Sequence, residues 1–204
     1  MAPVRRFSHT AGLVLAGGRS SRFGSDKAAA QIDGKSFLDL AVTGLRSSCR
    51  IIAVSAFPSS VAASSAANLG LNVLADRPGD PPGPLAGIRA GLDWARTQGV
   101  ERVAVRPVDT PFLAQDIFER LAEAIADAPA AYCVTDDGPQ PLCALWTLAS
   151  LSRLDEILAE HRHPSVFRLL DDIGAVRLKV EEWRMFANLN TADEFAQAQA
   201  KPAN

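Results

Sequence analysis

The sequence predicts an α/β fold: a single Rossmann-like, three-layer domain with a mostly parallel sheet and an antiparallel excursion in the C-terminal third. One observation is that short apolar runs of strand length alternate with longer segments whose apolar residues recur at helical spacing. Another is that these runs are apolar throughout, which is typical of parallel strands covered by helices on both faces. The sheet is therefore expected to lie between two helical layers.

The expected elements follow in order along the chain. Residues 37–45 illustrate the helical pattern, because Leu38, Val42 and Leu45 share one helix face. Residues 77–84 are expected to form a loop that leads into a helix, since prolines cannot donate into a ladder or a helix. The other expected helices span 61–69 and a segment through 117–125, and the strands span 11–16, 50–55, 71–75 and 102–106. The last third is predicted to add strands at 130–135, 141–146 and 175–180 and a helix at 148–160.

Length and composition restrict the function classes. The 204 residues fit one domain over 1–204, with flexible ends expected at 1–9 and 200–204. A net charge of −2 gives no basic excess, so neither nucleic acid nor a membrane is an expected partner. Three cysteines without CxxC spacing predict free thiols, and no segment approaches a membrane span, so we expect a cytoplasmic protein.

The segment from Leu15 to Lys27 carries the clearest chemical signal. It follows an apolar strand and holds three glycines, which let backbone N–H groups face an anion, while Arg19, Arg22 and Lys27 add positive charge. Its spacing fits neither a Walker A loop nor the dinucleotide fingerprint. A solvated basic loop is the alternative. Because α/β sheets bind ligands at the carboxyl ends of their strands, the pattern favours a polyphosphate-binding loop.

Two aspartates follow expected strands. Asp109 could hold Mg²⁺, which commonly takes one or two carboxylates plus substrate phosphates, or it could cap the next helix, because Thr110 and Pro111 suit a helix entry. The phosphate-binding loop on the same sheet edge favours the metal role. Asp76 could accept hydrogen bonds from a base or ribose, or stabilise its own turn. Near the C-terminus, Asn188 and Asn190 could be turn formers or could reach into the site.

At these residues the chain resembles the molybdenum cofactor guanylyltransferases. Five motifs occur in that family's order and approximate spacing, and together they cover most of the chain. They are Leu-Ala-Gly-Gly at 15–18, Ser-Ser-Arg-Phe-Gly-Ser-Asp-Lys at 20–27, Gly-Pro-Leu-Ala-Gly at 83–87, Pro-Val-Asp-Thr-Pro at 107–111 and Asn-Leu-Asn-Thr at 188–191.

The resemblance implies transfer of GMP from GTP to molybdenum-bearing molybdopterin, with Mg²⁺ as cofactor and pyrophosphate as second product. It implies that Mg²⁺ binds Asp109, with Asn190 as a second contact, and that Lys27, Asp109 and Arg22 are catalytic. The full candidate set for nucleotide binding is Leu15, Ala16, Gly17, Gly18, Arg19, Lys27, Asp76, Gly83, Leu85, Asp109, Asn188 and Asn190.

Some positions depart from the family pattern. Phe23 replaces the usual Met, and Ser55 and Phe57 lie where the family often has an Asn that touches the nucleotide. Relatives that use CTP tend toward Leu-Ala-Ala-Gly in the first loop, so Gly17 favours GTP. The alternatives are a molybdopterin cytidylyltransferase, another small-molecule nucleotidyltransferase or a non-catalytic nucleotide-binding adaptor. Transient contact with molybdopterin-loading or acceptor proteins is a further hypothesis.

Overall fold

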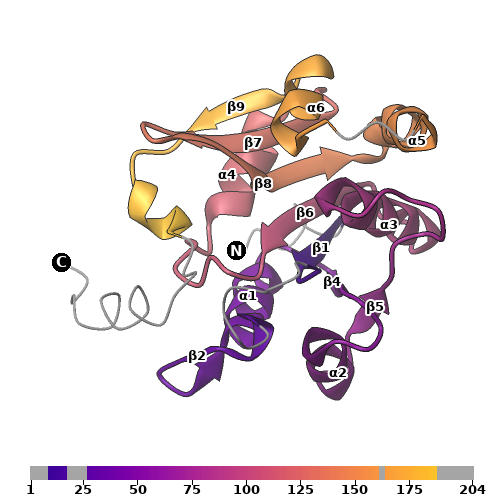
Figure 1. The fold of residues 1–204 in the computed structure, drawn as a ribbon. Helices are drawn as coiled ribbons and strands as arrows, with labels where there is room; N and C mark the ends of the chain where they lie inside the picture. The colour runs from indigo at the N-terminus through magenta and orange to yellow at the C-terminus, as the bar shows by residue number, and fades with distance from the viewer. Residues whose placement is uncertain (1–8, 18–26, 161–163, 188–204) are drawn as a thin grey trace.

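The computed structural model describes residues 9–17, 27–160 and 164–187 (Figure 1). Within them the main sheet has seven strands in the order β5-β4-β1-β6-β8-β7-β9, and β2 and β3 form a separate small hairpin. The strands are β1 (Thr10–Leu15), β2 (Gln31–Ile32), β3 (Lys35–Ser36), β4 (Ile51–Ser55), β5 (Asn72–Leu74), β6 (Arg102–Pro107), β7 (Ala130–Thr135), β8 (Gly138–Thr147) and β9 (Val176–Lys179).

The two halves of the sheet differ in direction. β5, β4, β1 and β6 are mutually parallel, and β8 then runs antiparallel to both β6 and β7, while β9 pairs parallel with β7. This arrangement confirms the predicted α/β class, with its mostly parallel sheet and its antiparallel excursion.

Helices cover both faces of the sheet (Figure 1). The alternation of side chains along a strand explains the continuous apolar runs: Val14 packs into the core with α1, α2 and α4, whereas Leu13 packs into the core with α3, α5 and α6. The helices are α1 (Phe37–Arg46), α2 (Val61–Asn68), α3 (Pro84–Thr97), α4 (Ile117–Ala124), α5 (Leu151–Ala159) and α6 (Val166–Asp172).

The structure departs from the sequence prediction mainly in the C-terminal third. The helix expected at 148–160 is divided into a 3-10 turn (η2, Leu148–Ser150) and α5. Helix α6 was not predicted, although Ser165 caps it by accepting a hydrogen bond from the Arg168 N–H at 3.2 Å. Strand β8 begins at Gly138, ahead of the predicted start at Pro141. Two further 3-10 turns, η1 (Lys27–Ala29) and η3 (Trp183–Phe186), were also not predicted.

Candidate nucleotide site

Four parallel strands end at one level of the sheet. Leu15 pairs with Ser55 on one side and with Pro107 on the other, and Ser55 pairs with Leu74. These four residues are the last of β1, β4, β6 and β5, so the loops that follow all leave the same edge. The sheet therefore brings the first loop and the segments of Asp76 and Asp109 to one edge, as expected for a ligand site of an α/β protein.

Backbone hydrogen bonds continue the ladder one residue past the strands. The Ala16 N–H donates to the Ser55 carbonyl at 2.9 Å, the Ala56 N–H to the Leu74 carbonyl at 3.1 Å, and the Val108 N–H to the Leu15 carbonyl at 3.1 Å. Each loop thus starts from a fixed backbone position. Asp109 lies one residue beyond the last of these anchors.

Asp109 does not cap the next helix. Helix α4 begins at Ile117 with Asp116 at its N-cap, well downstream of Asp109. The segment after Asp109 forms only a short turn, in which the Leu113 N–H donates to the Thr110 carbonyl at 3.3 Å. The side chain of Asp109 is half-buried. The helix-cap alternative is therefore wrong, and the metal role of Asp109 stays a prediction.

Asp76 is a half-buried carboxylate in a charged neighbourhood. Burial raises the pKa of Asp76 above its ordinary value, the nearby Asp80 raises it further, and Arg89 lowers it. The partner of Asp80 is Arg89 itself, since the two side chains form an ion pair and are 9% and 7% exposed. Asp76 therefore lies beside a buried ion pair that belongs to the loop entering α3.

The glycines of the 83–87 motif have structural reasons. Gly83, at the N-cap of α3, has a φ of +152°, a conformation that side chains disfavour, and Pro84 takes the first helical position. A Cβ at Gly87 would lie 2.5 Å from the Ser55 Oγ and 3.2 Å from Cδ2 of Leu15. Gly87 thus lets the first turns of α3 approach the ends of β1 and β4. The partial positive charge of that helix N-terminus consequently lies near the same sheet edge.

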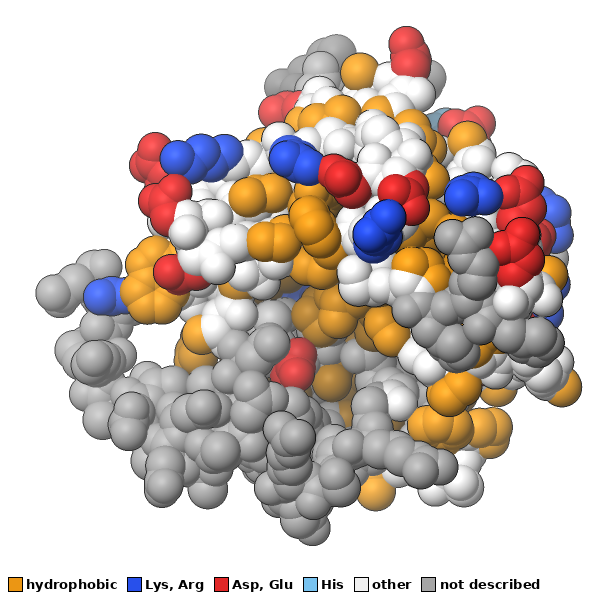
Figure 2. Space-filling model, turned by 45° about the horizontal axis from the view of Figure 1, so that its top comes forward, with side chains coloured by type: hydrophobic (Ala, Val, Ile, Leu, Met, Phe, Trp, Pro, Cys, Tyr) orange, Lys and Arg blue, Asp and Glu red, His pale blue; other side chains and the backbone are white. Residues whose placement is uncertain are grey.

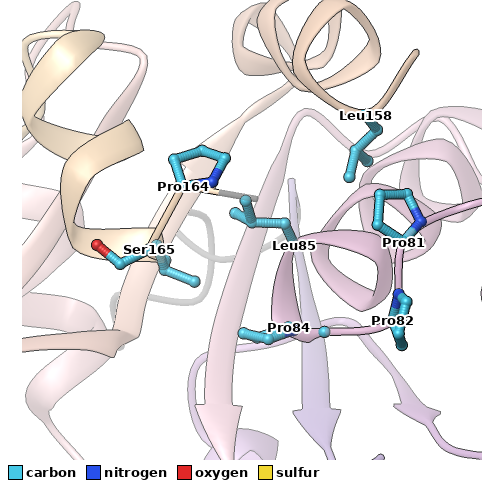
Figure 3. A pocket seen from close by; sticks show the side chains of 9 residues that line it. Pro81, Pro82, Pro84, Leu85, Leu158, Pro164 and Ser165 are labelled. Atoms are coloured by element: carbon cyan, nitrogen blue, oxygen red, sulfur yellow. The ribbon is translucent and has the colours of Figure 1, made fainter. Parts of the chain in front are cut away.

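A cavity of about 210 Å³ adjoins this helix start (Figure 3). Gly83 and Leu85, both predicted nucleotide contacts, line it together with Leu158 of α5. Figure 3 shows Leu85 and Leu158 directed into the space between α3 and the C-terminal helices. Neither Asp76 nor Asp109 lines it. The other lining residues are Pro81, Pro82, Pro84, Pro164, Ser165 and Val166.

Several predicted site residues lie outside the described residues. These are Gly18, Arg19, Arg22, Asn188 and Asn190, and the side chain of Lys27 is likewise not described, so their roles stay predictions. Of the first loop, Leu15 and Ala16 are half-buried and Gly17 is exposed. Among the described residues, the nearest atom to a Cβ built on Gly17 is the Ser55 carbonyl oxygen at 4.0 Å.

The described residues fit a hard cation that is completed by its substrate. No group of three or more His, Cys, Asp and Glu side chains that could hold a metal occurs in 9–17, 27–160 and 164–187. Mg²⁺ needs no such cage, because it commonly binds one or two carboxylates together with phosphate oxygens and water. The carboxylate of Asp109 at the sheet edge is a donor of the required type.

Sequence reasoning missed two buried arginines near this edge. Arg106, beside the apolar centre of strand β6, is 1% exposed, and Arg89 of α3 is buried as well. An arginine beside the apolar centre of a strand is a sequence signal that could have marked Arg106. Of the two residues near the end of β4 that depart from the family pattern, Ser55 is buried against Gly87 and Phe57 is 47% exposed.

Charge on the visible surface is mixed. Figure 2 shows Lys and Arg side chains interspersed with Asp and Glu across the described part of one face. The three cysteines are free thiols, as predicted, with the Sγ atoms of Cys133 and Cys143 3.7 Å apart. In the described ranges no helix has the length and apolar character to cross a membrane.

Asp76→Asn is expected to raise stability at neutral pH. A carboxyl whose pKa is raised by folding favours the folded state when protonated, and this contribution is lost as pH rises through the raised value. The melting temperature of the variant relative to wild type should therefore increase between pH 3 and pH 7. Thermal unfolding across this pH range checks it, with Asp33→Asn in the exposed β2–β3 turn as control. A melting-temperature difference between variant and wild type that stays constant from pH 3 to pH 7 would contradict a raised pKa of Asp76.

The chain is similar to a protein family, to curated proteins and to solved structures. The MobA-like NTP transferase domain family matches residues 12–175. A molybdenum cofactor guanylyltransferase of Rhodobacter capsulatus is 37% identical over 196 residues, which are 93% of this chain and 94% of the relative. The protein of the same name from Nitrobacter hamburgensis is 35% identical over 93% of each chain. The crystal structure of molybdopterin-guanine dinucleotide biosynthesis protein A from Archaeoglobus fulgidus aligns with a TM-score of 0.76 at 22% identity, covering 93% of this chain and 97% of that one.

Proposed function

The chain belongs to the MobA-like NTP transferase domain family, and on this premise we propose that it is a molybdenum cofactor guanylyltransferase. It transfers GMP from GTP to molybdenum-bearing molybdopterin and releases pyrophosphate. The observation that carries the proposal is the convergence of Leu15, Asp76, Asp109 and the start of α3 on one sheet edge, in a chain whose relatives of that name align over nearly their full length.

The bond changes define what the site must do. An oxygen of the terminal phosphate of molybdopterin attacks the α-phosphorus of GTP, and the bond from that phosphorus to the bridging oxygen of pyrophosphate breaks. Such a transfer depends on positioning and charge neutralisation rather than on a covalent enzyme intermediate. The site therefore needs anion-binding groups, a metal-binding carboxylate and contacts for the nucleoside.

The residues of the edge are assigned to these tasks. Backbone amides of residues 15–18 hold the phosphates, and Arg19, Arg22 and Lys27 stabilise the leaving pyrophosphate. Asp109 would hold Mg²⁺, with Asn190 as a second contact, and Asn188 would contact the nucleotide. When bound, Mg²⁺ offsets negative charge on the α-phosphate.

Contacts to the nucleoside come from the entry of α3. Asp76 accepts hydrogen bonds from the base or ribose. The cavity beside Gly83 and Leu85 offers apolar surface next to the backbone of the 83–87 motif, where a flat ring can approach closely because Gly83 has no side chain.

Two alternative functions can be distinguished from a guanylyltransferase by the nucleotide bound or by the release of pyrophosphate. A cytidylyltransferase would select CTP, and Gly17 in the first loop favours GTP instead. A non-catalytic adaptor would bind nucleotide without releasing pyrophosphate. Transient contact with a molybdopterin-loading or acceptor protein is a separate hypothesis, which co-purification during turnover would test.

GTP with Mg²⁺ is expected to stabilise the protein more than CTP, ATP or UTP does. A ligand that binds only the folded state, at a hundred times its Kd, adds about 2.7 kcal/mol to the unfolding free energy. A thermal-shift panel of the four nucleotides, each with and without Mg²⁺, measures this selectivity. A CTP-selective shift would move the assignment to a cytidylyltransferase, and no shift with any nucleotide would overturn it.

A turnover assay with molybdenum-bearing molybdopterin then separates enzyme from adaptor. The proposed function predicts one pyrophosphate released for each guanine dinucleotide cofactor formed. GTP binding without pyrophosphate release in the presence of molybdopterin would favour the adaptor.

A further inference from the structure

Arg106 is a buried cation, and the part of the chain that the structure describes offers it no acidic partner. It precedes the last residue of β6, its side chain is 1% exposed, and no carboxylate pairs with it among the described residues. Burial lowers the pKa of Arg106 to about 10. The Nε atom has no hydrogen-bond partner in the described structure. A buried, unpaired guanidinium is unfavourable for folding, so its presence calls for a specific role.

The bond that Arg106 makes is to the loop of Asp109. Its Nη2 donates to the Thr110 carbonyl at 2.7 Å, and the Thr110 hydroxyl donates to the Pro107 carbonyl at 3.1 Å. On the other side of Asp109, the Val108 N–H is bound to the Leu15 carbonyl. The backbone is thus held immediately before and immediately after Asp109.

Helix α1 leaves room for this guanidinium. A Cβ at Gly44 would lie 2.0 Å from the Nη1 of Arg106, closer than any side chain could tolerate. Gly44 is buried inside a helix, where glycine is less favourable than alanine. Two locally unfavourable features, a buried charge and a glycine inside a helix, therefore serve one contact to the Thr110 carbonyl.

We propose that Arg106 is a positioning residue that orients the carboxylate of Asp109 for productive binding of the metal–nucleotide complex, acting through the carbonyl of Thr110. The inference rests on the proposed function, because it assigns Asp109 to the metal. Arg106 touches neither substrate nor metal, since it lies within the core between β6 and α1. Partners that hydrogen-bond a ligating side chain affect metal affinity without contacting the ion, and Arg106 acts one step further out, through the backbone next to Asp109.

The test compares Arg106→Met, which keeps most of the volume without the donors, with Arg106→Lys and with Gly44→Ala. For each full-length variant, GTP affinity is measured by calorimetry with EDTA and with increasing Mg²⁺, and turnover is measured against Mg²⁺ concentration. Arg106→Met should raise the half-saturating Mg²⁺ concentration about 10- to 100-fold, the usual range for an outer partner of a metal ligand. GTP affinity in EDTA should stay unchanged.

Gly44→Ala should act in the same direction, because the added methyl displaces the guanidinium while Arg106 itself is retained. Arg106→Lys should rescue part of the Mg²⁺ response, since it keeps a donor on a shorter side chain. The matched control is Arg102→Met, at the opposite end of the same strand, which should leave the Mg²⁺ response as in wild type. The melting temperature of each variant shows whether the substitution lowers the stability of the fold. If Arg106→Met does not fold, Gly44→Ala and Arg106→Lys still decide the question.

A melting temperature lowered by Arg106→Met with an unchanged Mg²⁺ response would overturn the proposal and leave a purely structural arginine. Failure of the proposed function is seen separately, in the wild type. If the wild type prefers CTP, the same variants are compared with CTP, and the Mg²⁺ response still tests the role of Arg106. If the wild type binds no nucleotide, both proposals are overturned.

Discussion

Replacing Asp109 by asparagine is expected to reduce GMP transfer by about 10²- to 10³-fold while leaving the affinity for metal-free GTP almost unchanged. The substitution keeps the size of the side chain and removes the negative charge that favours a hard cation. The loss falls on turnover because neutralisation matters most where charge develops in the transition state, and removal of one such electrostatic contribution typically costs this much in rate. Single-turnover rates and GTP affinity, each measured with and without Mg²⁺, check the expectation.

The matched control is Asp116→Asn. Asp116 ends the same loop, is exposed and makes no side-chain capping bond at the start of α4, so its replacement should change neither rate nor affinity. Full turnover of Asp109→Asn would show that the metal is held elsewhere. An equal fall in metal-free GTP affinity would assign Asp109 to the nucleotide rather than to the metal.

The parallel half of the fold follows closely from local sequence. Strands β1 and β4 and the Val103–Val105 centre of β6 are mainly apolar because both faces of the sheet are covered there, and this pattern can be recognised without knowledge of the neighbouring strands. The start of β8 could not be read in this way. Pro139 and Pro141 argue against a strand, yet here β8 extends beyond its pairing with β6 and only β7 is paired alongside. Such a position depends on the surrounding sheet rather than on local propensity.

The candidate site residues also differ in how far local sequence predicts their position. The position of Asp76 and Asp109 at this sheet edge was predictable, because a carboxylate after a parallel strand emerges where such sheets bind ligands, while their roles stay predictions. Whether Asp109 capped a helix was not predictable, since Thr110 and Pro111 favour a helix entry and the choice depends on the following turn. The contacts of Arg106 could not be predicted from the sequence either. The Arg106 guanidinium donates to the Thr110 carbonyl and occupies space that Gly44 leaves free. Only the packing of α1 on β6 brings these features together.

A second buried arginine holds the loop that carries Asp76. Arg89 of α3 forms an ion pair with Asp80, and its Nη1 lies 3.3 Å from the Oδ1 of Asp155 on α5. Arg77, in the same loop, pairs with Asp93 of α3. The loop before Gly83 is thus fastened to α3 by two arginines, although its proline-rich sequence has no regular secondary structure to hold it in place.

Arg89→Met should therefore lower the unfolding free energy by about 3–5 kcal/mol, because it leaves Asp80 buried without its partner. It should also raise the pKa of Asp76 further, since Arg89 lowers that pKa in the wild type. Arg96→Met on the same helix breaks an exposed pair with Asp93 and should cost less than about 1 kcal/mol. The double variant Arg89→Met with Asp80→Asn should recover part of the loss, because the remaining side chain is uncharged. Denaturant unfolding of the four proteins distinguishes these cases, and equal effects of Arg89→Met and Arg96→Met would mean that burial adds nothing to the Arg89–Asp80 pair.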